Sequence, residues 1–105
     1  KEYTTEDGKS PFGNALEKFK DERAQIKITT AVKKMKKGNF GVHRGVGGSV
    51  MEVVIDYAKG YRIYYAKDND GESLIILLAT GHKGTQTNDI EKAKEYWKDY
   101  KKRKR

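Results

Sequence analysis

"VMEVVIDYAKGYRIYYAKDNDGESLIILLAT", residues 50–80, has the pattern of three consecutive β-strands joined by two tight turns. In residues 50–57 one face is apolar, and the other carries Glu52, Val54 and Asp56. Residues 58–60 and 68–71 have turn composition and separate the runs. The last run, residues 73–80, is apolar without alternation, which predicts a central strand buried on both faces.

Helical patterns flank this meander on both sides. Ser10 followed by Pro11 marks a helix start, because serine caps the helix and proline suits its first position. Asp21 is the expected cap of a second helix, which Gly38 ends. Apolar residues at positions 90, 93, 97 and 100 predict a closing helix, with Thr85, Thr87 and Asn88 as alternative caps.

This order of elements predicts a single α+β domain spanning residues 1–105. The helical hairpin and the C-terminal helix are expected to pack on one face of a small antiparallel sheet, which leaves the other face partly open. Short strands are also expected at residues 1–5 and 40–44.

The charge of the chain is concentrated at its end. The formal net charge is +8, and five of those positive charges lie in a basic tail at residues 101–105, "KKRKR". We expect this tail to be solvated and mobile. Two interpretations stay open, namely long-range attraction to nucleic acid and a solubilising end.

The composition also excludes several classes of protein. The absence of cysteine removes disulfides, thiolate zinc sites and cysteine nucleophiles, and neither histidine has metal-ligand spacing, so we expect no metal and no cofactor. The longest uncharged apolar run, residues 74–79, is too short to span a bilayer, and the charged first residues do not resemble a signal peptide. We expect a cytoplasmic protein with no membrane partner.

Arg62 and Lys83 are the first candidates for function. Arg62 points away from the apolar face of its strand, and its planar donors match two phosphate oxygens. The alternative is a cross-strand ion pair with Glu52 or Asp56. Lys83 follows the last strand and precedes a helix, where free backbone N–H groups collect anions.

Histidines and tyrosines supply weaker candidates. His82, beside Lys83, and His43 are the two histidines, and imidazole is the usual proton carrier near neutral pH. Tyr64 and Tyr57 either stack on bases or fill the core, whereas Tyr61 and Tyr65 are expected in the core.

The segments "YTTEDGKSPF", "KKGNFG", "GYRIYY" and "GHKGTQTNDIEKAKEYW" together resemble the RelE/ParE superfamily of bacterial toxins, in its HigB-like branch of phage-derived addiction module killer proteins. This resemblance covers nearly the whole chain. It implies a compact sheet flanked by helices, a cognate antitoxin that neutralises the toxin, and ribosome-dependent endonucleolytic cleavage of mRNA.

The resemblance also suggests roles for individual residues. Arg62 matches the arginine of the family's "YR" motif, and Lys83 occupies the basic position after the last strand. Both are therefore expected to stabilise the transition state of a metal-independent endoribonuclease. Arg44 stands where relatives carry a lysine or arginine, and it is expected to hold the RNA backbone. The remaining expected RNA contacts are Tyr64, His82 and His43.

One position departs from the family. Relatives commonly read "ELR" on the second strand of the meander, and this chain reads "EVV", with Val54 in place of the arginine. This departure favours two alternatives, a ParE-like toxin that binds DNA gyrase and a degenerate, non-catalytic module that binds an antitoxin or DNA. Convergence of Arg44, Arg62 and Lys83 on one open face would favour the nuclease.

Overall fold

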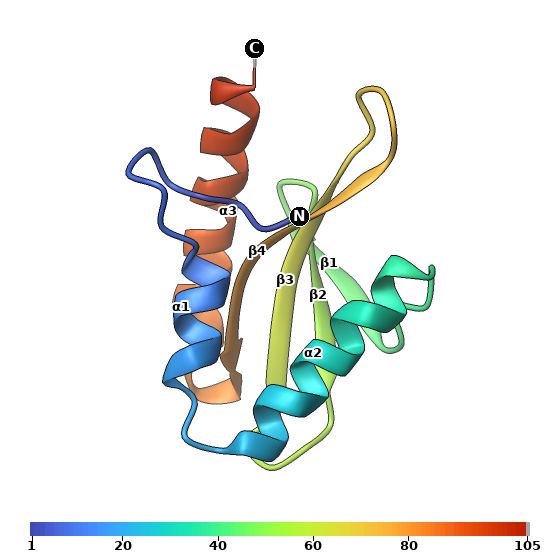
Figure 1. Ribbon diagram of the computed structural model, residues 1–105, viewed down its shortest axis with the longest axis vertical. Coiled ribbons are helices and arrows are strands. Elements are labelled where there is room, and N and C mark those ends of the chain that lie inside the picture. The colour runs from blue at the N-terminus through green and yellow to red at the C-terminus, as the bar shows by residue number, and fades with distance from the viewer. Residues whose placement is uncertain (105) are drawn as a thin grey trace.

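The computed structural model describes residues 1–104, which form an α+β fold of three α-helices on a four-stranded antiparallel sheet (Figure 1). The sheet order is β1-β2-β3-β4, and a short 3-10 helix, Lys83–Thr85, precedes α3. In chain order the elements are α1 (Pro11–Lys18), α2 (Glu22–Lys36), β1 (His43–Gly47), β2 (Val50–Ile55), β3 (Tyr61–Asp68), β4 (Leu74–His82) and α3 (Gln86–Arg103).

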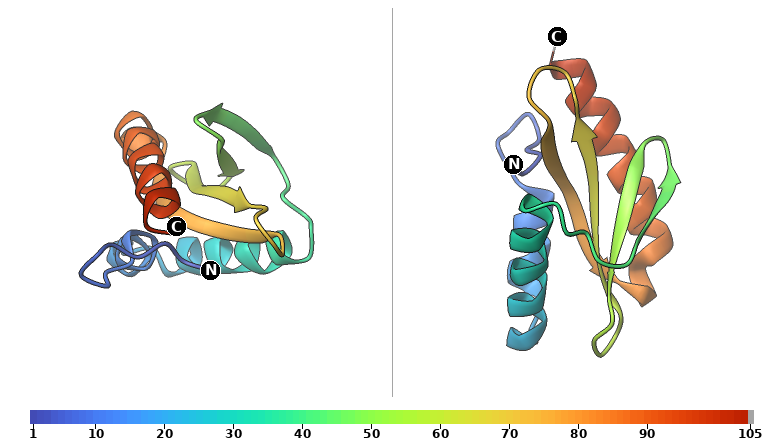
Figure 2. Two further views of the ribbon diagram at one scale, coloured as in Figure 1. Left: turned by 90° about the horizontal axis from the view of Figure 1, so that it is seen from above. Right: turned by 90° about the vertical axis from the view of Figure 1, so that its right-hand side faces the viewer.

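The helices cover both faces of the sheet. Figure 2 shows α1 and α2 on one side of the strands and α3 on the other. On the first side Phe12 and Ile28 pack against Ile63, and on the second Trp97 packs against Leu78. The prediction that all helices share one face was therefore wrong. Helix α3 packs on the second face because the residues of β3 and β4 that point to that face are also apolar.

Strand β4 lies at the edge of the sheet, so the prediction of a central strand was wrong in position. Its middle residues are nevertheless buried, because helices cover both faces. The open edge is covered by the start of the chain, which makes a parallel bridge between Glu2 and Leu77. There the Tyr3 N–H donates to the Leu77 carbonyl at 2.9 Å, and the Leu77 N–H donates to the Lys1 carbonyl at 2.8 Å.

The helix caps follow the local sequence. The Ser10 hydroxyl accepts the Gly13 N–H, and Asp21 accepts the N–H groups of Arg23 and Ala24. These two starts are confirmed. The bounds of the first strand differ from the predicted ones, and the start of the last helix matches one of the predicted caps. The first strand runs over His43–Gly47 rather than residues 40–44. Helix α3 begins at Gln86, so Thr85, one of the three expected caps, is its N-cap residue, although its side chain makes no capping hydrogen bond.

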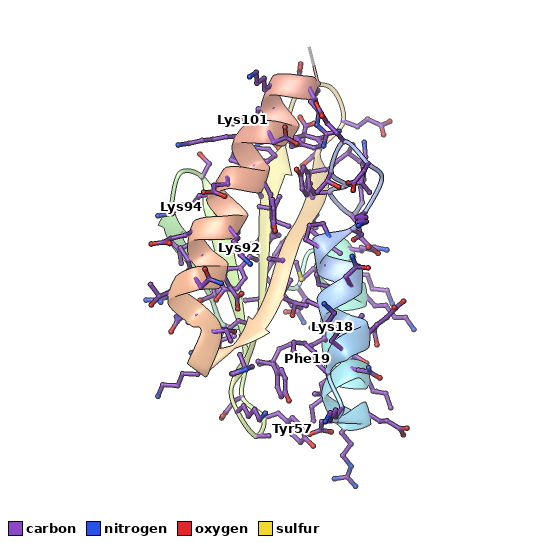
Figure 3. The ribbon with its side chains drawn as sticks, turned by 90° about the vertical axis from the view of Figure 1, so that its left-hand side faces the viewer. Lys18, Phe19, Tyr57, Lys92, Lys94 and Lys101 are labelled. Atoms are coloured by element: carbon purple, nitrogen blue, oxygen red, sulfur yellow. The ribbon has the colours of Figure 1, made fainter. Side chains whose placement is uncertain are left out.

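The end where α1 meets α2 is closed by aromatic packing. Phe19 and Tyr57 lie together there (Figure 3), and both contact Tyr61, with ring centroids 5.1 and 6.3 Å away. The Tyr57 hydroxyl donates to Asp21 at 3.0 Å, so Tyr57 ties the β2–β3 turn to the cap of α2. Tyr61 and Tyr65 are buried in the core as predicted.

The basic tail continues α3 instead of leaving the domain. Residues 101–103 are helical, Arg103 pairs with Asp99 at 2.8 Å, and Lys104 donates to Asp68 at 2.5 Å. The expectation of a mobile tail was therefore wrong for residues 101–104, and Arg105 lies outside the described residues. No helix in residues 1–104 is both long and apolar enough to cross a membrane.

Candidate functional site

A buried carboxylate, Glu52 on β2, organises the polar residues of the sheet. Its side chain is fully buried. The Arg44 Nε donates to Oε1 at 2.9 Å, and the Gln86 Nε2 donates to Oε2 at 3.0 Å. The Arg62 Nε lies 3.5 Å from Oε2. A buried carboxylate without partners is costly, so these donors are what permits Glu52 to sit inside the fold.

Strand register explains why these groups meet. Glu52 is directly opposite Arg44 on β1 and Tyr64 on β3, so their side chains share one face of the sheet. Gln86 comes from the first residue of α3, which starts over the same face. Burial alone would raise the pKa of Glu52, but the hydrogen bonds from Arg44 and Gln86 outweigh it and lower that pKa.

Arg62 is held at the edge of this face. Its side chain is 12% exposed, and its Nη1 donates to the Gly60 carbonyl at 2.6 Å. Its Nε is buried without a hydrogen bond of good geometry, whereas Nη2 bonds to no described residue and keeps access to solvent. The predicted open face is covered by α3, and the alternative pairing with Glu52 is confirmed. One guanidinium nitrogen still points outward.

Lys83 and Arg62 both lie close to Gly60. A Cβ placed on Gly60 would lie 3.2 Å from the Arg62 Nη1 and 3.7 Å from the Lys83 Cβ. The Lys83 N–H also donates to the Lys59 carbonyl at 3.3 Å, which draws the end of β4 towards the β2–β3 turn. Lys83 is exposed and makes no ion pair with any residue from 1 to 104.

Arg44, Arg62 and Lys83 therefore lie around one end of the sheet, the first two joined through Glu52. Arg44 keeps 60% of its side chain exposed. Arg44 and Arg62 share the Glu52 carboxylate, whereas Lys83 pairs with no acid among the described residues. The cluster therefore carries more positive than negative charge and offers N–H donors. Such donors suit a tetrahedral or planar anion.

A second polar group, formed by His82, Thr85 and Asp89, borders the cations. The His82 Nδ1 accepts the Gly84 N–H at 3.0 Å, so neutral His82 carries its proton on Nε2. Thr85 donates to Asp89 at 2.5 Å. The Asp89 carboxylate lies against Gly81, the residue opposite Arg62, where a Cβ would overlap its oxygen. Burial raises the pKa of Asp89 despite the Thr85 hydrogen bond.

The two remaining expected RNA contacts lie elsewhere. Tyr64 is fully buried, and burial and the adjacent Glu52 carboxylate raise its pKa, so the expectation that it stacks on a base was wrong. Its place on β3 directs it into the core beneath α3. His43 lies on β1, where its Nδ1 contacts the Gly41 carbonyl at 2.9 Å and its ring packs near Phe40. The structure does not bring His43 to the cluster around Lys83.

An uncharacterized protein of Haemophilus influenzae (strain ATCC 51907 / DSM 11121 / KW20 / Rd) is 41% identical to this chain over 83 residues, which are 79% of this chain and 82% of that protein. The chain belongs to the same family as this protein. No family model and no solved structure matches the chain.

Sequence reasoning named Glu52 only as an alternative partner of Arg62, and it missed the contacts of Glu52 with Arg44 and Gln86 and the part of Asp89. The signal for Glu52 was present, because an acid in the alternating strand shares a face with Arg62. The contribution of Gln86 depends on where α3 starts. No local pattern could show that this side chain reaches a carboxylate on β2.

Proposed function

We propose that this protein is the toxin of a type II toxin–antitoxin system and that it cleaves mRNA on the ribosome. The observation that carries the proposal is the approach of Arg62 and Lys83 at Gly60, with Arg44 joined to Arg62 through Glu52. The toxin would act in the cytoplasm, where translated mRNA is found, and a cognate antitoxin protein would neutralise it. The resemblance to RelE/ParE-superfamily toxins supports the same activity.

The proposed reaction uses RNA as its own nucleophile. The 2′-oxygen attacks the adjacent phosphorus, the bond from phosphorus to the 5′-oxygen breaks, and the products end in a 2′,3′-cyclic phosphate and a 5′-hydroxyl. Negative charge grows on the phosphate oxygens during this step. The outward Nη2 of Arg62 and the ammonium of Lys83 would bind that charge, each contributing on the order of 2–4 kcal/mol as oxyanion donors do. Arg44 would hold a neighbouring phosphate.

The reaction also moves one proton from the 2′-oxygen to the 5′-oxygen. The titratable side chains beside Gly81 and Lys83 are His82 and Asp89, whereas Glu52 is already paired with Arg44 and Arg62. His82 offers an Nε2–H, and Asp89 has a raised pKa, which brings its proton affinity closer to that of a neutral-pH acid. We assign the proton transfer to this pair.

Primer extension on cellular mRNA after brief induction tests the proposal. Wild type is expected to produce discrete cuts within translated frames, whereas Arg62→Ala and Lys83→Ala are expected to lose about 30- to 1,000-fold in cutting rate, the equivalent of 2–4 kcal/mol. Lys98→Ala, an exposed lysine change on α3, is the matched control and should cut normally. A fully active double variant of Arg62 and Lys83 would end the assignment.

One observation favours the gyrase-binding alternative. Val54 stands where relatives of the toxin family carry an arginine, and it lines an apolar cavity beside α2 instead of adding a cation opposite Arg62. A toxin acting through a protein interface needs no such cation. Growth arrest without mRNA cuts would support this alternative, and no arrest at all would support a non-catalytic module.

A further inference from the structure

A cavity of about 490 Å³ lies between α2 and the end of β2. Its lining combines apolar residues, among them Ile26, Ala31, Phe40, Val54 and Ile55, with the polar residues Lys27, Thr30, Lys34, Asn39 and Asp56. Ile26 is 63% exposed, and the neighbouring Val42 is 72% exposed. Two large aliphatic side chains so exposed, one in the lining and the other next to the lining residue Gly41, are typical of an interaction surface.

The edge of β2 is covered along most of this cavity. Strand β1 pairs with β2 up to Val53, and one further hydrogen bond joins the Val54 N–H to the Val42 carbonyl at 2.9 Å. Beyond that point Ile55 pairs with Tyr61 of β3, and its carbonyl accepts the Tyr57 N–H. The cavity, here called the groove, therefore offers a second chain its side chains rather than a free strand edge.

The rim of the groove is basic. Lys27 and Lys34 line it, and neither makes an ion pair with a residue between 1 and 104. Asp56 is the acid in the lining. An occupant that matches this surface carries apolar side chains on one side and carboxylates beside them.

The aromatic arrangement favours polypeptide over RNA. Phe40 is the aromatic residue in the lining, and its ring is already stacked on Tyr65 at 5.2 Å, with the Lys67 ammonium 4.8 Å from its centroid. It therefore offers no free platform on which a base could stack. The aliphatic floor suits leucine-like side chains, and the Asp56 carboxylate opposes phosphate.

We propose that this groove binds an acidic, amphipathic segment of a partner protein. The identity of that partner as the neutralising antitoxin rests on the proposed function, but the binding itself does not. Because α2 and α3 lie on opposite sides of the sheet (Figure 2), a segment in the groove leaves Arg62 and Lys83 uncovered. Groove binding and RNA binding are thus expected to be independent.

A displayed library of random 16-residue peptides, selected against the purified full chain, tests the groove. Enriched peptides are expected to combine Asp or Glu with regularly spaced apolar residues. A synthetic peptide of the most enriched sequence should bind Ile26→Glu at least tenfold more weakly than wild type. Leu74→Glu makes the same change at another exposed aliphatic residue, in the β3–β4 hairpin, and should bind within twofold of wild type. Thermal unfolding checks that both variants fold.

Three results would overturn the proposal. The first is enrichment of peptides without acids, or equal affinity for the wild type and Ile26→Glu. The second is binding of single-stranded RNA that is lost in Ile26→Glu and kept in Leu74→Glu, which would make the groove an RNA site. The third is a wild-type dimer in sedimentation that Ile26→Glu dissociates, which would make the occupant a second copy. Because none of these assays measures RNA cleavage, the proposed toxin activity stands or falls separately.

Discussion

The sheet contains two buried carboxylates, and they differ in what their partners have left to offer. Asp68, at the end of β3, accepts hydrogen bonds from the Tyr100 hydroxyl at 2.7 Å, from Lys104 at 2.5 Å and from the Asp70 N–H at 3.0 Å. Lys104 also pairs with Asp70 at 3.2 Å. These groups are turned towards one another, so the cluster closes the end of α3 against the β3–β4 hairpin.

Glu52, near the other end of α3, orients donors that still face outward. Its partners Arg44 and Arg62 each keep at least one guanidinium nitrogen free of Glu52, and Gln86 ties the start of α3 to it. Two carboxylates with similar burial thus anchor the two ends of one helix. The hydrogen-bond donors around Asp68 are directed at one another and at Asp68. The arginines that pair with Glu52 still have guanidinium nitrogens that do not contact it. This difference is the reason for placing the proposed site at the Glu52 end.

The largest effect is expected from Glu52→Ala, which removes one of these two buried carboxylates. The change leaves Arg62 largely buried without its counter-charge and opens a cavity, so we expect a loss of about 3–5 kcal/mol in the free energy of unfolding. Urea denaturation measures it. Glu72→Ala, in the exposed β3–β4 turn, is the control and should stay within about 0.5 kcal/mol of wild type. A loss below about 1 kcal/mol would mean that Glu52 is not a structural anchor.

Gly81→Ala attacks the same end of α3 by steric overlap. The new Cβ would collide with the Asp89 carboxylate and approach the Thr85 hydroxyl, so the first turn of α3 has to move, at a cost of about 1–3 kcal/mol. Gly45→Ala on β1 is the matched control, because its Cβ would meet only the Met51 sulfur at an ordinary 3.7 Å.

Thermal unfolding compares the two alanine variants. Asp89→Ala in the Gly81→Ala background should recover part of the loss, since the colliding carboxylate is then absent. Equal stability of Gly81→Ala and wild type would contradict the close approach.

The contribution of Asp68 to the free energy of unfolding should be lost at low pH. Hydrogen bonds from Lys104 and Tyr100 lower the pKa of Asp68 from 3.8 to about 2. Because the folded-state pKa lies below the ordinary value, this carboxylate stabilises the fold above about pH 4, and that contribution is lost as pH falls towards about 2. In urea denaturation Asp68→Asn should therefore lose less stability across that window than wild type. Glu72→Gln, an exposed acid in the same hairpin, should follow the wild-type curve.

Much of the local structure could be predicted because its causes are local. Ser10 with Pro11, and Asp21, fix helix starts through hydrogen bonds to the next few residues. The place of β4 could not be predicted in this way. An apolar run buried on both faces fits a central strand, and equally an edge strand covered by helices and by the start of the chain. The choice depends on packing between distant segments.

The candidate site also has one part that local sequence predicts and another part that depends on packing between distant segments. The positions of Arg62 and Lys83 at neighbouring strand ends followed from the meander, and the structure brings both to Gly60. Burial of Tyr64 followed from the side that α3 covers, which depends on the whole sheet and not on the alternation of β3. The roles of Arg62 and Lys83 in cleavage stay predictions until cutting is measured.

The smallest expected effect comes from Tyr100→Phe. It removes one hydrogen bond to Asp68 and keeps the ring, which stacks on Trp97 at 5.3 Å, so the loss in the free energy of unfolding should be about 1 kcal/mol. Tyr96→Phe makes the same change on the same helix, where the ring stacks on Tyr3, and serves as the control. In the Asp68→Asn background Tyr100→Phe should cost less, because the charged acceptor is gone. An equal cost in both backgrounds, measured as a double-mutant cycle in urea, would show that the Tyr100 hydroxyl does not act through the Asp68 carboxylate. Asp68 would then be held by Lys104 and the hairpin backbone alone. The Asp68 and Glu52 clusters would then differ only in the free guanidinium groups beside Glu52.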